Sequence, residues 1–180
     1  EKHFDEAHRA LDDLLRGSGN LLGRLESFRE RFLVPTETLA QVIEHINTEL
    51  RKRTKDLFSL PDEEAFTIEF VKDKPWSGYN WYEGNYRSRI DINMDLPKHL
   101  HGLPPLLAHE GYPGHHTERS LKEASLYRKQ QHLEHSICLI NSPEAVQAEG
   151  IAENALAQVM SESDVTELLI DLLPLSNVQA

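Results

Sequence analysis

A short histidine-rich block carries the residue types that metal-assisted hydrolysis requires. It contains His109, Glu110 and His115, and Glu149 follows later in the chain. A catalytic zinc ion takes three His or carboxylate ligands, keeps one position open for water, and works beside a separate carboxylate that accepts a proton from that water. These four residues supply every one of these groups. We therefore expect one Zn²⁺ ion held by His109, His115 and Glu149, with Glu110 as the general base.

The spacing of the two histidines departs from the common His-Glu-x-x-His form, in which ligands four residues apart share one helix face. Pro113 occupies the position of the second histidine. Proline has no N–H for the helix and its ring pushes on the carbonyl of His109, so the helix has to break. Gly111 and Gly114 flank the break and can adopt backbone angles closed to other residues. We predict that the chain loops outward and returns His115 to His109.

Three further side chains are candidates for supporting or replacing these ligands. His116 is the alternative to His115, and whichever of the two does not bind metal can donate to a carboxylate or to substrate. Glu153 lies four residues after Glu149, on the same face of a helix, and can orient a ligand imidazole. Glu118 is either a second acceptor of this kind or a solvated acid of the helix face.

The helix that carries Glu149 is predicted to begin at Ser142, because serine caps helices and Pro143 suits a first turn. Gly150 in its interior costs about 1 kcal/mol of helix stability relative to alanine. Close approach to the metal helix is the expected reason for that glycine.

Two motifs resemble a known family. The chain reads HEGYPGHHTE and then EGIAE, which is similar to the HExxPGHH and EGxA blocks of the bacterial domain-of-unknown-function 885 family. Members of that family look like mostly helical zinc peptidases of the gluzincin type. The resemblance implies metal ligands at His109, His115 and Glu149 and a general base at Glu110.

The resemblance covers part of the chain, about residues 75 to 160, and takes in the stretch from Tyr86 to Asn93. Ile151 and Asn154 depart from the commoner EGWALYAE form of the second motif, so that part of the pocket is expected to differ. Family chains are much longer than 180 residues, and we expect this chain to be a fragment of a longer protein.

The elements that must position these residues are predicted to be mainly helical. Apolar residues recur at helical steps from Phe4 to Phe32, where Gly17, Gly19 and Gly23 are candidate interruptions, and again from Leu39 to Leu57. We expect residues 1–60 to form a helical hairpin that packs on a metal domain of residues 61–180, the two parts making one domain.

Short strands are predicted between these helices and the histidine block. Phe66–Phe70 and Tyr86–Asn93 have strand patterns with turn residues between them. The expected fold class is mainly α with a small antiparallel β-sheet (α+β) and a zincin-like metal helix broken by Pro and Gly. We expect the Tyr86–Asn93 strand at the sheet edge beside the metal helix, where it would bind a peptide by strand addition. Arg89 and Asn93 would contact the substrate, Arg89 through a substrate carboxylate.

The composition of the chain limits the kinds of partner that we expect it to bind. The net charge of −11 argues against nucleic acid and anionic membranes. No apolar run approaches the roughly 20 residues of a membrane span, and no signal peptide is visible, which favours a cytoplasmic protein. The single cysteine, Cys138, lies in an apolar stretch and is expected to be a buried thiol.

The main hypothesis is a zinc-dependent peptidase in which Glu110 drives water at a peptide carbonyl. A metal-dependent amidohydrolase acting on small amides would use the same groups. A third possibility is a site that binds metal without catalysis, although structural zinc is typically closed by four Cys or His ligands and the chain has one Cys. His132 and His135, near Glu134, lie on the helix expected after the site and have no assigned role.

Overall fold

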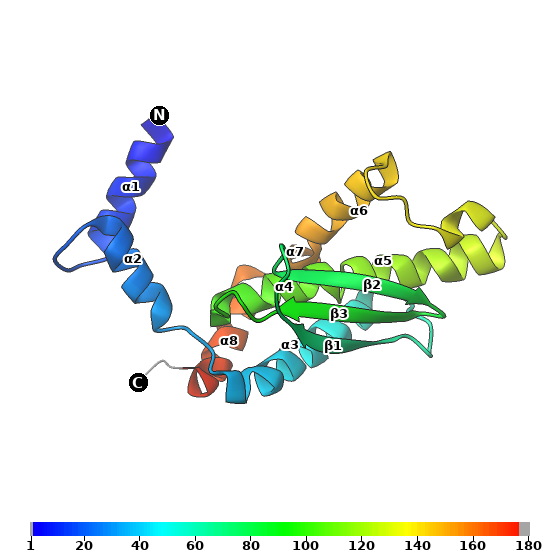
Figure 1. The fold of residues 1–180 in the computed structure, drawn as a ribbon, viewed down its shortest axis with the longest axis horizontal. Helices are drawn as coiled ribbons and strands as arrows, with labels where there is room; N and C mark the ends of the chain where they lie inside the picture. The colour runs from blue at the N-terminus through cyan, green and yellow to red at the C-terminus, as the bar shows by residue number, and fades with distance from the viewer. Residues whose placement is uncertain (1, 177–180) are drawn as a thin grey trace.

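The computed structural model describes residues 2–176, which are mainly helical with one small sheet (Figure 1). The α-helices are α1 (Lys2–Leu14), α2 (Leu21–Glu30), α3 (Thr36–Leu57), α4 (Leu103–Glu110), α5 (His115–Lys122), α6 (Pro143–Glu153), α7 (Ala155–Val159) and α8 (Glu162–Leu172). The strands are β1 (Ala65–Val71), β2 (Gly78–Gly84) and β3 (Arg87–Asn93). Short turns are η1 (Leu100–Gly102), η3 (Leu133–Ser136) and η4 (Leu173–Leu175), and η2 (Glu123–Lys129) is a π-helix that continues α5.

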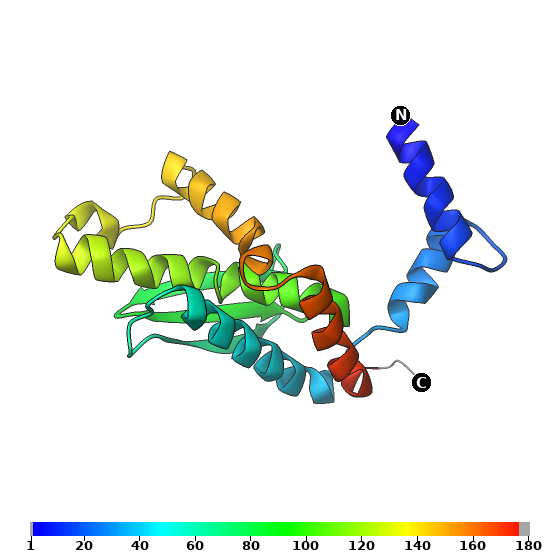
Figure 2. The same cartoon turned by 180° about the vertical axis from the view of Figure 1, so that it is seen from behind.

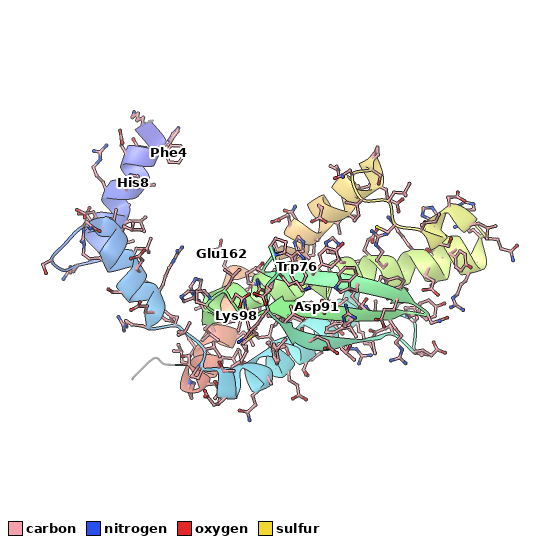
Figure 3. The ribbon with its side chains drawn as sticks, viewed as in Figure 1. Phe4, His8, Trp76, Asp91, Lys98 and Glu162 are labelled. Carbon is pink, nitrogen blue, oxygen red and sulfur yellow. The ribbon has the colours of Figure 1, made fainter. Side chains whose placement is uncertain are left out.

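The first two helices form an arm that projects from the rest of the molecule (Figures 1 and 2). The predicted apolar run is divided because Gly17 and Gly19 have φ angles of +148° and +102°, which L side chains rarely adopt. Neither α1 nor α2 has a buried residue. Phe4 and His8 extend from α1 far from the sheet (Figure 3). Of residues 1–60, α3 is the helix that packs against α4 and α7.

The core lies between α3, α4 and the sheet. One face of α3 buries a helical stripe that includes Leu39, Ile43 and Ile46. This stripe belongs to the same cluster as Leu107 of α4 and Ile90 of β3. The sheet lies in front of α3, α4 and α5 in Figure 1, and these helices lie in front of the sheet in the opposite view of Figure 2. The helices therefore cover one sheet face, and α4 and α5 are fixed against it.

The sheet is mixed, which corrects the prediction of an antiparallel sheet. The strand order is β1-β3-β2, with β3 parallel to β1 and antiparallel to β2. The turn at Asn85 and Tyr86, both with positive φ, sends the chain back from β2 into the position beside β1. The strand predicted at the edge, β3, is therefore the central strand, and β2 is an edge strand beside α4 and α5.

The connector between η2 and α6 corrects the expectation of a buried cysteine. Cys138 is exposed, as are its apolar neighbours Ile137, Leu139 and Ile140. The connector contains only the short turn η3 and does not pack its apolar side chains into the core. Across residues 2–176, every helix is either too short or too polar to cross a membrane.

Candidate metal centre

The break between α4 and α5 is a tight loop over Gly111–Gly114. The Gly111 N–H reaches the carbonyl of Leu107, and the Gly114 N–H reaches that of Ala108, each at 2.8 Å. A Cβ on Gly114 would lie 2.0 Å from the His109 carbonyl oxygen. The backbone therefore passes so close to the end of α4 that only glycine fits at this position.

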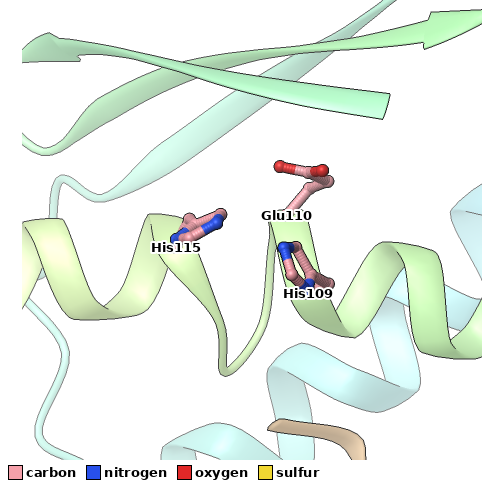
Figure 4. Close-up of side chains that lie close together, drawn as sticks. All are labelled: His109, Glu110 and His115. Carbon is pink, nitrogen blue, oxygen red and sulfur yellow. The ribbon is translucent and has the colours of Figure 1, made fainter. Parts of the chain in front are cut away.

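This loop brings the two expected histidine ligands together, as Figure 4 shows. The ring centroids of His109 and His115 lie 4.8 Å apart, and the rings are nearly perpendicular, at 88°. In an unbroken helix, residues six apart would lie about 9 Å apart along the axis. The outward loop removes this separation, as the Pro-Gly pattern predicts.

Glu149 on α6 meets both imidazoles. Its Oε2 lies 3.3 Å from His109 Nε2, and its Oε1 lies 3.4 Å from His115 Nε2. Donor atoms at about 2.0–2.1 Å from a tetrahedral zinc ion stand about 3.3 Å from one another. The three side chains therefore have the donor types of a zinc site, and each of the two distances from Glu149, which end on different carboxylate oxygens, matches the spacing of neighbouring ligands. Glu153 lies farther out, with Oε1 3.9 Å from His109 Nδ1.

Glu110 is the buried acid of the group. It offers a carboxylate oxygen within 4.8 Å of a ring nitrogen of His109 and of His115. Burial raises the pKa of Glu110 to about 7, the charge of Glu149 adds to the rise, and a hydrogen bond with the backbone of Asn80 opposes it. A carboxyl group with a pKa near neutrality is suited to exchange protons with a reacting group.

The surroundings of His115 favour its neutral imidazole. Burial lowers its pKa, and the neighbouring His109 lowers it further, against the opposing charges of Glu149 and Glu118. Neutral imidazole is the ligand form of histidine. Glu118 pairs with Lys122 and with Arg119, the latter at 3.4 Å. The structure thus places Glu118 near His115 but in a cluster with cations.

His116 faces away from this centre. Its ring is fully buried, with Nδ1 2.8 Å from Ser88 Oγ and Nε2 3.0 Å from Glu64 Oε2. Both ring nitrogens therefore already have protein partners. Of the two histidines, His115 is the one that the structure brings to His109 and Glu149, and His116 anchors the start of α5 to the core.

Glu64 is a residue that the sequence analysis did not single out. It is buried between α3 and β1, where it accepts hydrogen bonds from Tyr112, from His116, and from Arg51 Nε at 2.9 Å. Burial alone would raise the pKa of Glu64, but the bonds from His116, Tyr112 and Arg51 outweigh it and lower the pKa. Tyr112 and His116 lie on either side of the loop apex, so one carboxylate fixes the loop from behind.

Arg89 and Asn93 are not brought to the centre. Arg89 pairs with Asp91 at 2.9 Å and lies over the Trp81 ring, on the sheet face away from α4. The Asn93 amide is buried and donates to the carbonyls of Lys74 and Trp76. Because β3 is the central strand, its backbone is already paired on both sides and has no free edge for a peptide.

The edge strand β2, in contrast, lies against α4 and α5. The Asn80 amide donates to the Glu110 carbonyl at 2.7 Å. A Cβ on Gly78 would lie 3.4 Å from Glu110 Oε1. Sequence reasoning missed both residues, although glycine in a strand is a known signal of close approach.

Ser142 caps α6 as expected, accepting a hydrogen bond from the Ala145 N–H at 3.1 Å. The reason expected for Gly150 is wrong, because nothing lies within 4 Å of a Cβ at that position. The close approach is made by Ala148 and Ala152, which are buried on the neighbouring face. Small side chains at these two positions let α6 approach α4 and α5.

Comparison of the chain with models of protein families, with curated proteins and with solved structures found no match.

Proposed function

We propose that the chain is a zinc-dependent hydrolase that acts on peptide bonds, with His109, His115 and Glu149 as ligands and Glu110 as general base. The proposal rests on the contacts of Glu149 with two imidazoles. One carboxylate oxygen lies 3.3 Å from His109 Nε2, and the other lies 3.4 Å from His115 Nε2. A fourth group, Glu110, is buried beside them, with a carboxylate oxygen within 4.8 Å of a ring nitrogen of each histidine. This arrangement suits a ligand set with a separate base.

A zinc ion in this centre would lower the pKa of a bound water and polarise a substrate carbonyl. In the proposal, Glu110 accepts the proton of the attacking water and passes it to the leaving nitrogen. The Asn80 side chain holds the Glu110 carbonyl and so fixes the last turn of α4. The Glu64 network holds His115 in place indirectly, through its neighbour His116.

A peptide substrate is supported by the position of β2. This strand has a partner only on its β3 side, and Gly78 leaves space beside Glu110. An extended peptide can add to such an edge by main-chain hydrogen bonds, which places its carbonyls along the strand. We therefore assign substrate binding to β2 in this proposal, in place of β3. A small amide would gain little from a strand edge.

The test combines zinc content with cleavage of a mixed peptide library, read by mass spectrometry, for the unsubstituted chain and two variants. Glu110→Gln is expected to retain zinc and to lower kcat by about 10²- to 10⁴-fold, the usual contribution of a general base. Glu153→Gln is the matched control, because it changes an exposed acid beside His109. This variant should keep most of the activity. Equal cleavage by the Glu110 variant would refute the base assignment. Zinc binding with no cleavage of peptides or small amides would identify a non-catalytic metal site.

A further inference from the structure

We propose a second divalent-metal site on the connector between η2 and α6, formed by His132, Glu134 and His135. Each residue offers one ligand atom, and these atoms all lie within 4.8 Å of one another. None of the three belongs to the candidate metal centre. The proposal therefore does not depend on the proposed hydrolase function.

The local backbone explains why these side chains converge. Residues three apart in a 3₁₀-helix lie directly above one another, because the helix has three residues per turn. His135 belongs to the 3₁₀ turn η3, His132 is its N-cap, and the His135 N–H bonds to the His132 carbonyl at 3.1 Å. The two rings stack with centroids 6.2 Å apart and planes inclined by 21°. Glu134 lies between them in the chain and supplies the carboxylate.

The turn is held at its start by the preceding helix. Gln131 takes a positive φ of 59°, and the His132 N–H then bonds to the Leu126 carbonyl of η2 at 3.0 Å. The backbone of His132 is thus fixed before any ion binds, which limits the positions open to its imidazole. Preorganised donors lose less entropy on binding.

The donor set selects the class of ion. Two imidazoles and one carboxylate, with other positions left to water, suit Zn²⁺ and its neighbours among the late first-row divalent metals. His132 and Glu134 are exposed and His135 is half-buried, so an ion can enter from solvent. The net charge of −11 favours the approach of a cation.

Such an ion would stabilise the segment that leads into α6. The connector has little packing of its own, since Leu133, Leu139 and Ile140 are 66–73% exposed. His135 Nδ1 lies 3.5 Å from Glu144 Oε1 in the first turn of α6, and Lys122 of α5 reaches the same oxygen at 2.7 Å. The ion would therefore fix a turn that already contacts the start of the helix bearing Glu149.

The experiment counts zinc ions per chain by calorimetric titration with zinc chloride. The unsubstituted chain should bind two ions, and both His132→Ala/His135→Ala and His109→Ala should bind one. The variant carrying all three substitutions should bind none. His99→Ala/His101→Ala is the matched control, because those two rings also stack, 5.7 Å apart, but form no three-residue group with a carboxylate within the described residues. That control should still bind two ions.

The five counts separate this site from the candidate metal centre. If His132→Ala/His135→Ala binds as many ions as the unsubstituted chain, the connector site does not exist. The same conclusion follows if the His99/His101 control loses an ion equally. If His109→Ala changes nothing while His132→Ala/His135→Ala loses an ion, the connector site stands and the proposed centre fails. Circular dichroism should show all variants folded.

Trypsin cleavage after Lys129 gives a second measurement that needs no ion count. In the His109→Ala chain, zinc should slow this cleavage severalfold, because the adjacent turn becomes fixed. In the chain that also carries His132→Ala and His135→Ala, zinc should have no effect on the rate of cleavage after Lys129. Equal protection in both chains would overturn the proposal.

Discussion

The two halves of the candidate metal centre are held in place very differently. His109 and His115 belong to the loop between α4 and α5, which the buried Glu64 network fixes from behind. Glu149 comes from α6, which buries only Ala148 and Ala152, and its own side chain is 61% exposed. The loop with the two histidines is therefore part of the core, whereas Glu149 belongs to a helix with few buried residues.

The geometry of the centre and its closure therefore have separate causes. The loop sets where the imidazoles lie, because its hydrogen bonds are buried and a buried polar group left without a partner is unfavourable. The approach of α6 sets whether the third ligand is present. Four substitutions test this division through the free energy of unfolding of the metal-free chain, in decreasing order of the predicted change.

Gly114→Ala should have the largest effect. The added Cβ would lie 2.0 Å from the His109 carbonyl oxygen and 2.3 Å from that of Ala108, both backbone atoms that cannot turn aside. We expect destabilisation by more than about 4 kcal/mol, measured by urea unfolding, together with loss of zinc binding. Gly102→Ala, at a glycine with nothing within 4 Å of the new Cβ, is the control. A stable, zinc-binding Gly114 variant would show that the loop is not fixed as described.

Glu64→Gln should have the next largest effect on the free energy of unfolding. The substitution removes the charge that Arg51, Tyr112 and His116 share in a buried site, and the amide cannot accept all of their hydrogen bonds. We expect a loss of about 3 kcal/mol and zinc affinity lower by about 10- to 100-fold, as for other residues that support metal ligands. Glu63→Gln, an exposed neighbour, should change neither quantity. If Glu64→Gln left zinc affinity intact, the loop would not depend on this network.

Gly150→Ala should have a small effect of the opposite sign. Nothing lies within 4 Å of the new Cβ, and the glycine is inside α6. Alanine should therefore stabilise the helix by about 0.5–1 kcal/mol, seen in the same urea titrations, and zinc affinity should not fall. A destabilised variant would mean that α6 packs more closely on this face than the contacts of Gly150 indicate.

Glu149→Ala should leave the stability of the metal-free chain within about 0.5 kcal/mol of its original value, because the side chain is largely exposed. Its zinc affinity should nevertheless fall by more than about 100-fold, since the loss of a ligand exceeds the loss of a supporting residue. Glu153→Ala is the matched control and should retain zinc. Retained zinc in the Glu149 variant would assign the third ligand to another acid.

The local part of this centre can be predicted from the sequence. Pro113 between two glycines requires a break in the helix, and a break is what allows His109 and His115 to meet. The Ser142 cap and the Tyr86–Asn93 strand are likewise found, the latter as β3. These features depend on neighbours in the chain, so their signals lie within a few residues.

The remaining features depend on contacts between distant segments. Nothing around Glu64 distinguishes it from the exposed Glu63, because its role comes from Arg51, Tyr112 and His116. The alternation of side chains along β3 fits a central strand as well as an edge strand. The strand order and the parallel pairing of β3 with β1 therefore cannot be predicted from the sequence.

The shallow packing of α6 has a consequence for how the ion would enter and leave. Because α6 has two buried residues and follows an exposed connector, we expect it to open more often than α4 and α5. Its backbone amides should therefore exchange with deuterium sooner than those of α4. Zinc at 100 times its dissociation constant would add about 2.7 kcal/mol to that protection, and the lifetime of the bound ion would be set by how often α6 opens.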